Sequence, residues 1–260
     1  MLGRQVAGSE VYDPGLLFPV PRATARGSLS GGRFDGFGED VWHAYELSWL
    51  SASGMPRMFV GTLCVPITSV NLVESKSLKL YLNSLNNHRF ADEAEAVATI
   101  EGDVGTVVEA PVSLALHRPD DGAFAGAALD ADCLDDLEVS VPDAPDASAL
   151  EVREGSERVC THLMRSRCPV TSQPDWATVV IEARGAVAER STLLAYLLAY
   201  RNHQEFHEQC VERIYTDLLQ RLAPRYLSVQ ALYTRRGGID ISPWRCSEDR
   251  PAPGLRINRQ

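Results

Sequence analysis

The sequence predicts an α+β fold in which apolar helices pack on one face of antiparallel sheets. Strand-like runs alternate with helical segments along most of the chain, and a set of residues recurs at a constant spacing. The chain has 260 residues, of which 45% are hydrophobic and 23% charged. These values are ordinary for a globular protein, and the length is sufficient for one large domain or two small ones.

The first half of the chain combines an arm, a module and a connector. We expect residues 1–40 to form an extended arm because they are rich in glycine and proline. A module follows at 41–118, with strand, strand, helix and strand expected at 41–50, 58–67, 77–100 and 111–118. Residues 119–155 are expected to form a solvated connector, because eleven acidic residues and one basic residue lie between Asp120 and Glu154.

The second half, 156–260, repeats the pattern of the first. A strand, two helices and a strand are expected at 176–185, 191–201, 208–222 and 227–236. Six residues of the first half recur as identical residues 115 positions later, namely Glu74 and Glu189, Leu78 and Leu193, Tyr81 and Tyr196, Leu82 and Leu197, Asn87 and Asn202, and His88 and His203. The simplest interpretation is two copies of one module, joined by the acidic connector.

Charge and hydropathy disfavour several classes of protein. The net charge of −10 is the wrong sign for a protein that grips nucleic acid through its phosphates. No apolar run approaches the roughly 20 residues that cross a bilayer, so no membrane partner is expected. The start of the chain, MLGRQVAGSEVYDPG, lacks the apolar core of a signal peptide. We therefore expect a cytoplasmic protein.

The stretch SRCPVTSQPDW, residues 166–176, holds a thiol and a carboxylate close to two prolines. Cys168 could act as a nucleophile if its environment lowers the pKa of the thiol. Asp175 could act as a general acid if burial beside Trp176 raises the pKa of its carboxyl. The alternative is a buried cysteine and a surface aspartate in an ordinary turn.

Two helix starts offer binding groups. His207 and Glu208 lie in FHEQ, and a carboxylate there can accept two N–H groups from one edge of a purine-like base. Lys76 lies in ESKSLKLY, where a helix N-terminus and a lysine could bind phosphate. The alternatives are an ordinary helix start that favours an acidic residue, and a solvated helix face.

Two further stretches could bind ligands: a glycine pair after two arginines, and a weak metal-binding pattern. YTRRGGIDISPW places Arg236 before Gly237, where an arginine could clamp a phosphate and a glycine would allow close approach of a ligand. The alternative is a turn with exposed arginines. Cys160, His162 and Cys168 could together bind zinc, although they supply only three ligands. There is no G-x-G-x-x-G or Walker A motif.

Four of these motifs together resemble one enzyme family. ESKSLKLYLNS, SRCPVTSQPDW, NHQEFHEQCVERI and YTRRGGIDISPW are similar to QueF, the NADPH-dependent 7-cyano-7-deazaguanine reductases, in their long two-module form. The resemblance runs from about Val41 to the C-terminus and excludes the acidic connector. It implies the tunnelling fold (T-fold), with two tandem modules that each have an antiparallel sheet and helices on one face, and assembly as a homodimer.

The resemblance also implies a reaction and a set of site residues. The family reduces the nitrile of 7-cyano-7-deazaguanine to a primary amine with two NADPH, on the route to the queuosine base of tRNA. Cys168 matches the nucleophile that forms a covalent thioimide, and Asp175 matches the proton donor. The positions that match substrate-binding residues are Val73, Glu74, Ser75, His207 and Glu208. Those that match NADPH-binding residues are Ser75, Lys76, Arg236 and Gly237, and no metal is implied.

Two rival interpretations remain open. One is a zinc-dependent cyclohydrolase of the same fold that uses Cys160, His162 and Cys168, and a metal assay would separate it from the reductase. The other is a non-catalytic module that binds a purine or RNA. The negative net charge disfavours RNA, and the pairing of Cys168 with Asp175 disfavours an inactive protein.

Overall fold

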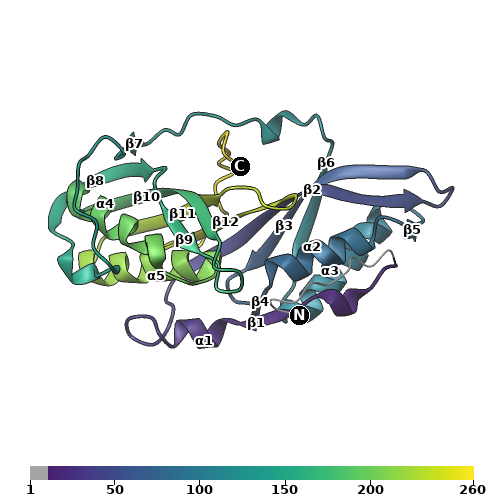
Figure 1. Ribbon diagram of the computed structural model, residues 1–260, viewed down its shortest axis with the longest axis horizontal. Helices are drawn as coiled ribbons and strands as arrows, with labels where there is room; N and C mark the ends of the chain where they lie inside the picture. Colours follow the sequence, from purple (N-terminus) through teal and green to yellow (C-terminus); the bar gives the residue numbers. More distant parts are fainter. Residues whose placement is uncertain (1–10) are drawn as a thin grey trace. The chain divides into compact units, whose positions relative to one another are not determined.

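The computed structural model describes residues 11–260, and the chain within it forms two compact units (Figure 1). Of the described residues, the first unit comprises 11–24, Asp40–Ala125 and Arg235–Ile241, and the second comprises Ala25–Glu39, Gly126–Thr234 and Ser242–Gln260. Residues 1–10 of the predicted arm lie outside the described residues. The units are discontinuous in sequence, so that β2 (Phe37–Ser51) and β12 (Ile239–Cys246) each supply residues to both.

The first unit combines strands with two helices. Its elements are β1 (Pro19–Pro21), β3 (Pro56–Pro66), β4 (Asn71–Val73), α2 (Ser75–Ser84), β5 (Arg89–Phe90), α3 (Glu93–Val108) and β6 (Ser113–His117), besides most of β2. β3 lies between β2 and β6 and is antiparallel to β6, while β1 and β4 pair antiparallel. Leu47, Leu78 and Ile100 bring sheet and helices into one buried core.

The second unit is built on an antiparallel sheet. Its elements are α1 (Arg22–Arg26) in part, β7 (Asp132–Cys133), β8 (Val152–Thr161), β9 (Arg165–Arg167), β10 (Pro174–Ala188), α4 (Arg190–Leu198), α5 (His207–Leu222) and β11 (Tyr226–Tyr233). β10 is antiparallel to β8, β9 and β11, while β7 joins β8 in parallel. Ile181, Leu194 and Ile214 link the sheet, α4 and α5 in one core. The α+β class with predominantly antiparallel sheets is confirmed.

Repeated residues take corresponding local places in the two units. Tyr81 in α2 donates a hydrogen bond to Asp103 Oδ2 at 2.6 Å, and Tyr196 in α4 donates one to Asp217 Oδ2 at 2.7 Å. Both rings are buried, and burial raises the pKa of each phenol above its usual value, with the neighbouring carboxylate adding to the effect.

The helix predicted as one segment at 77–100 is two helices. α2 ends at Ser84, and α3 begins at Glu93 after Asp92 accepts a hydrogen bond from Glu95 N at 2.8 Å. The intervening turn passes through Asn86 and Asn87, residues that favour turns, before β5 pairs with β2.

The acidic connector predicted at 119–155 contains short structured pieces. A 3₁₀ turn at Gly122–Phe124, β7, and a 3₁₀ turn at Ala147–Ala149 lie within it. Leu134 and Leu150 are each 1% exposed and belong to the core of the second unit. These apolar side chains anchor a segment whose composition is mainly acidic. Over residues 11–260, none of the helices has the length and apolar character that crossing a membrane requires.

Candidate active site

Cys168 lies in a tight hairpin between β9 and β10. Its N–H donates to Gln173 O and its carbonyl accepts from Ser172 N, both at 2.9 Å. Ser172 adopts a left-handed conformation with φ of 57°. The β9–β10 register places Asp175 opposite Ser166, so the hairpin continues as paired strands. The backbone on both sides of the half-buried thiol is therefore fixed.

Asp175 and His207 are brought together within the second unit. Asp175 belongs to β10 and is 3% exposed, while His207 is the first residue of α5. Asp175 Oδ2 lies 3.2 Å from His207 Nε2. The two can share a proton, because a carboxyl and an imidazole at this distance exchange donor and acceptor roles.

The burial of Asp175 does not come from Trp176, contrary to expectation. Successive residues of a strand point to opposite faces of the sheet, so Trp176 faces away from Asp175. The guanidinium groups of Arg165 and Arg201 each lie 5.7 Å from the Trp176 ring centroid, and that of Arg259 lies 5.9 Å from it. Trp176 thus forms a surface cation–π cluster.

Tyr233 is a residue of this site that the sequence did not single out. Its ring stacks on His207 with centroids 3.9 Å apart. Burial raises the pKa of its phenol well above 10, and the nearby Cys210, Asp175 and Glu208 add to that effect. The residue ends an apolar run, LSVQALY, and therefore has the sequence signature of a core residue.

Glu208 follows His207 in the first turn of α5 and is 3% exposed. A charged cluster just before the helix holds its start. Glu205 Oε2 lies 2.8 Å from His203 Nε2, and Glu205 also pairs with Arg213 within α5. Burial opposes ionisation of Glu205, but hydrogen bonds from His203 and Arg213 outweigh it and lower the pKa of that carboxyl.

The predicted residues Val73, Glu74, Ser75 and Lys76 lie at the junction of β4 and α2 in the first unit. Glu74 is 6% exposed and caps α2, because its carboxylate accepts from Lys76 N at 3.1 Å and from Ser77 N at 2.8 Å. These two amides are thus unavailable for a phosphate. A phosphate near this helix would have to be bound by side chains.

The Arg236–Ile239 turn also lies in the first unit. Arg236 N donates to Ile239 O at 2.9 Å, and Gly237 and Gly238 have φ of 60° and 81°. A Cβ atom on Gly237 would lie 2.5 Å from Lys79 Nζ. The turn therefore packs directly against a lysine of α2, which adds Lys79 to the cationic residues of this region.

The predicted site residues thus form two groups, one in each unit. Cys168, Asp175, His207 and Glu208 belong to the second unit, and Val73, Glu74, Ser75, Lys76, Arg236 and Gly237 belong to the first. The zinc set that included Cys168 is not assembled. In the described part of the chain, Cys160 and His162 are grouped with Cys133 instead.

The second unit combines a thiol on a fixed hairpin with a buried carboxylate–imidazole pair, a combination suited to covalent catalysis with proton transfer.

A family model described as "Nitrile reductase, 7-cyano-7-deazaguanine-reductase N-term" matches residues 9–116. A second model, described as "QueF-like protein", matches residues 174–252.

Full-length relatives give the same result. The chain is 48% identical to the NADPH-dependent 7-cyano-7-deazaguanine reductase of Chromohalobacter salexigens, with 100% of this chain and 96% of the relative covered. It is 49% identical to the enzyme of that name from Xanthomonas campestris pv. campestris (strain B100), covering 97% and 94%. It is 45% identical to that of Bordetella pertussis, covering 100% and 97%. The chain belongs to the family of NADPH-dependent 7-cyano-7-deazaguanine reductases.

Proposed function

We propose that the chain is an oxidoreductase that converts the nitrile of 7-cyano-7-deazaguanine into the primary amine of 7-aminomethyl-7-deazaguanine, in queuosine biosynthesis. The observation that carries the proposal is 48% identity over the whole chain to a relative named for reduction of this compound with NADPH. The buried Asp175–His207 pair supports it, because nitrile reduction requires a proton donor.

Cys168 begins the reaction by adding to the nitrile. A nitrile is a poor hydride acceptor, and sulfur addition makes it a better one. The Cys168 sulfur forms a bond to the nitrile carbon, one π bond of C≡N breaks, and the nitrogen takes up a proton. The product is a covalent thioimide. The hairpin amide contacts at Cys168 and Ser172 support this role by fixing the backbone that carries the thiol.

Asp175 donates the proton to the substrate nitrogen. His207 holds the carboxyl through the 3.2 Å contact, and Tyr233 fixes the imidazole by stacking on it. Asp175 can therefore deliver a proton to the substrate, and it can take up another proton through the His207 imidazole.

Carboxylates recognise the base. Glu208 and Glu74 are both nearly buried and offer acceptors to the N–H edge of the deazaguanine, with Val73, Ser75 and His207 as further substrate-binding residues. Glu74 already accepts two backbone N–H groups, and each carboxylate oxygen retains capacity for another hydrogen bond.

Cationic side chains of α2 and of the Arg236–Ile239 turn, both in the first unit, suit the phosphates of NADPH. Lys76, Lys79 and Arg236 supply positive charge, and Gly237 and Ser75 allow close approach and hydrogen bonding. When bound, NADPH supplies hydride in two rounds, so that the nitrile carbon reaches the level of an imine and then of an amine. Between the rounds the carbon–sulfur bond breaks, and Cys168 regains a proton. Over the whole reaction two protons and two NADPH are consumed.

We further propose tandem T-fold modules at 41–118 and 156–260, with the arm at 1–40 and the connector at 119–155, in a cytoplasmic homodimer without direct nucleic-acid binding. The matching Tyr81–Asp103 and Tyr196–Asp217 hydrogen bonds support an internal repeat. The alternative of a zinc-dependent cyclohydrolase is not favoured, because the relatives are named as reductases and Cys168 is not in the metal-ligand cluster.

A direct assay tests the reaction. The purified chain is mixed with NADPH and 7-cyano-7-deazaguanine, and nicotinamide absorbance is followed together with product mass. The expected result is two NADPH oxidised per amine formed. Absence of nitrile-dependent oxidation contradicts the proposed function, and one NADPH per product contradicts the two-round scheme.

A further inference from the structure

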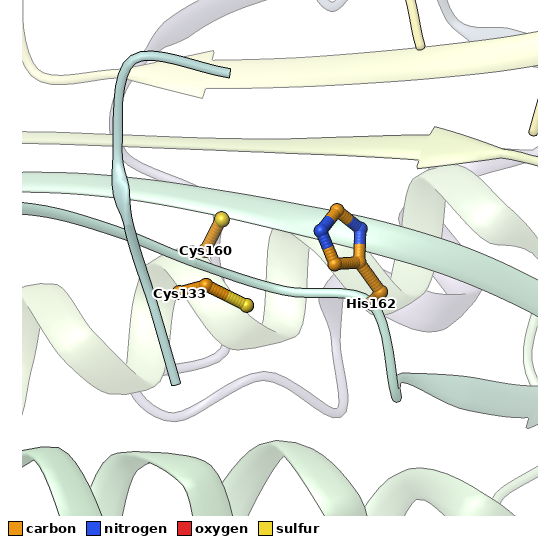
Figure 2. Close-up of side chains that lie close together, drawn as sticks. All are labelled: Cys133, Cys160 and His162. Carbon is orange, nitrogen blue, oxygen red and sulfur yellow. The ribbon is translucent and has the colours of Figure 1, made fainter. Parts of the chain in front are cut away.

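Cys133, Cys160 and His162 lie close together in the second unit (Figure 2). Cys133 belongs to β7, Cys160 to β8, and His162 directly follows β8. Cys133 is opposite Cys160 in the parallel register of these strands. Paired residues on neighbouring strands project to the same face, which brings the two sulfur atoms together. The two sulfurs and a ring nitrogen of His162 all lie within 4.8 Å of one another.

The His162 ring is held in place from outside the cluster. His162 Nδ1 lies 2.8 Å from Oγ1 of Thr178, a side chain with no exposed surface. This contact occupies one ring nitrogen and orients the other, which Figure 2 shows on the side of the two cysteines. An imidazole held in this way by a neighbouring acceptor is typical of a metal ligand.

Asp135 fixes the backbone around the cluster. Its carboxylate accepts from Thr161 Oγ1 at 2.6 Å and from His162 N at 3.1 Å. Leu134 N donates to Cys160 O at 2.8 Å, which ties the segment after β7 to β8. These hydrogen bonds hold the backbone that carries the three residues, and they leave the two cysteine sulfur atoms available to a ligand.

A carboxylate lies beside the cluster. Asp135 accepts hydrogen bonds from Thr161 Oγ1 and His162 N, next to two of the proposed ligands. A bound cation would offset its negative charge.

We propose that Cys133, Cys160 and His162 bind a thiophilic divalent ion of the zinc class, with a water molecule as fourth ligand on the exposed side of Cys133. Two thiolates and one imidazole match the donor set that Zn²⁺ prefers. With Zn–S bonds of about 2.3 Å, tetrahedral sulfur atoms lie roughly 3.8 Å apart, so the cluster needs to contract by about 1 Å at most. Each cysteine loses its proton on binding, and no electron transfer is involved.

The ion would act as a structural clamp. β7 has two residues, both exposed, and it covers the outer edge of β8. Such a short strand is weakly held, and a metal joining it to β8 would stabilise the edge. The site shares no residue with the proposed catalytic set, so it does not depend on the proposed function.

Metal stoichiometry tests the inference. The full chain, reduced with a phosphine and dialysed against Zn²⁺ in slight excess, should retain about one Zn²⁺ per chain by mass spectrometry of the metal. Cys133→Ser and His162→Gln should each lower retention at least tenfold at the same free Zn²⁺, because a two-ligand site binds much more weakly. Cys64→Ser, at a half-buried cysteine of the first unit, should retain the ion.

Two further readouts use the exposed Cys133, whose substitution leaves the core intact. Co²⁺ should give a thiolate-to-metal charge-transfer band in the parent chain, and Cys133→Ser should weaken it. Chelation should lower the melting temperature of the parent and leave that of Cys133→Ser unchanged, while nitrile reductase activity of Cys133→Ser matches the parent. The inference is overturned if the reduced parent retains no Zn²⁺, or if Cys133→Ser retains as much as the parent.

Discussion

The starts of helices α2 and α4 carry equivalent residues with different partners. Glu74 and Glu189 both precede a helix, but Glu74 caps its helix with two hydrogen bonds, whereas Glu189 makes no such bond and pairs with Arg153 at 3.3 Å. The following tyrosines, in contrast, keep the same carboxylate hydrogen bond in both units. The two tyrosines thus make the same kind of contact, whereas the two glutamates at the helix starts have different partners.

The equivalent histidines differ in the same way. His88 packs against the rings of Tyr12 and Phe90, with centroids 4.9 Å and 4.6 Å away. His203 also packs against a ring, that of Tyr200 at 5.2 Å, and in addition it pairs with Glu205, just before the helix that carries His207 and Glu208. The second unit thus has a carboxylate, Glu205, at the position where the first has Phe90, and it also carries the Cys168 hairpin. Under the proposed function, the reacting groups Cys168 and Asp175 both belong to this second unit.

The largest effect is expected at Asp175. Asp175→Asn preserves shape but cannot release a proton, so the rate of nitrile reduction should fall roughly 10²–10⁴-fold. Substrate binding should persist, because the variant keeps its acceptor oxygen. Single-turnover measurement of adduct formation and of NADPH oxidation checks both. A variant that reduces the nitrile at the parent rate would move the proton donor to another residue, with His207 the next candidate.

The second effect concerns base recognition by Glu208. Glu208→Gln places an amide donor against a donor on the base, which should weaken substrate binding by about 1.5–3 kcal/mol. Binding of NADPH should be unchanged, since the residues proposed for it belong to the first unit. Isothermal titration with each ligand separates these results. Equal loss for both ligands would mean that the start of α5 had been damaged.

A substitution at Glu205 tests the charged contacts of this residue with His203 and Arg213 at the start of α5. Glu205→Gln should lower the free energy of unfolding at pH 7 by about 1.5–3 kcal/mol, because charged hydrogen bonds from His203 and Arg213 are lost. The pKa of Glu205 is lowered from 4.5 in the folded chain. Its contribution is therefore complete above pH 4.5 and is lost as the pH falls through the lower folded value.

Urea denaturation of parent and Glu205→Gln at a series of pH values measures this effect. The gap between the two curves should be constant near neutrality and shrink below pH 4.5. A gap that does not change with pH would show that shape, rather than charge, underlies the stabilisation.

The smallest effect is expected on stability, when the glutamates at the starts of α2 and α4 are each replaced. Glu74→Ala removes a cap with two hydrogen bonds and should destabilise the chain by about 0.5–2 kcal/mol. Glu189→Ala removes only a half-exposed ion pair and should cost less than about 0.5 kcal/mol. Thermal denaturation of the matched variants checks the order. Equal losses would contradict the difference in capping.

Much of the fold follows from hydrophobic periodicity alone. The helix α5 buries one apolar stripe, and the strand β10 is a run of apolar residues that is buried on both faces at its centre. Both patterns are visible in the sequence. The break between α2 and α3 was missed because the apolar pattern continues on both sides of it. The parallel pairing of β7 with β8 was also missed, since two residues of an acidic segment give no strand signal.

The residues of the candidate site also divide into those that the sequence indicates and those that only the structure shows. Cys168, Asp175 and His207 could be singled out because they lie in motifs that together resemble one enzyme family, although each motif alone also fits an ordinary turn or helix start. Tyr233 does not stand out, because its stacking on His207 depends on a contact between distant segments. The same limitation applies to Cys133, whose neighbours Cys160 and His162 are close in space and distant in sequence.

The covalent role of Cys168 is tested most directly by the mass of the intact chain. Incubated with 7-cyano-7-deazaguanine and no NADPH, the parent should gain the mass of one substrate molecule per chain, because addition to a nitrile expels nothing. Cys64→Ala and Cys210→Ala should gain the same mass, and Cys168→Ala should gain none. An adduct that persists in Cys168→Ala would contradict the assignment of the nucleophile.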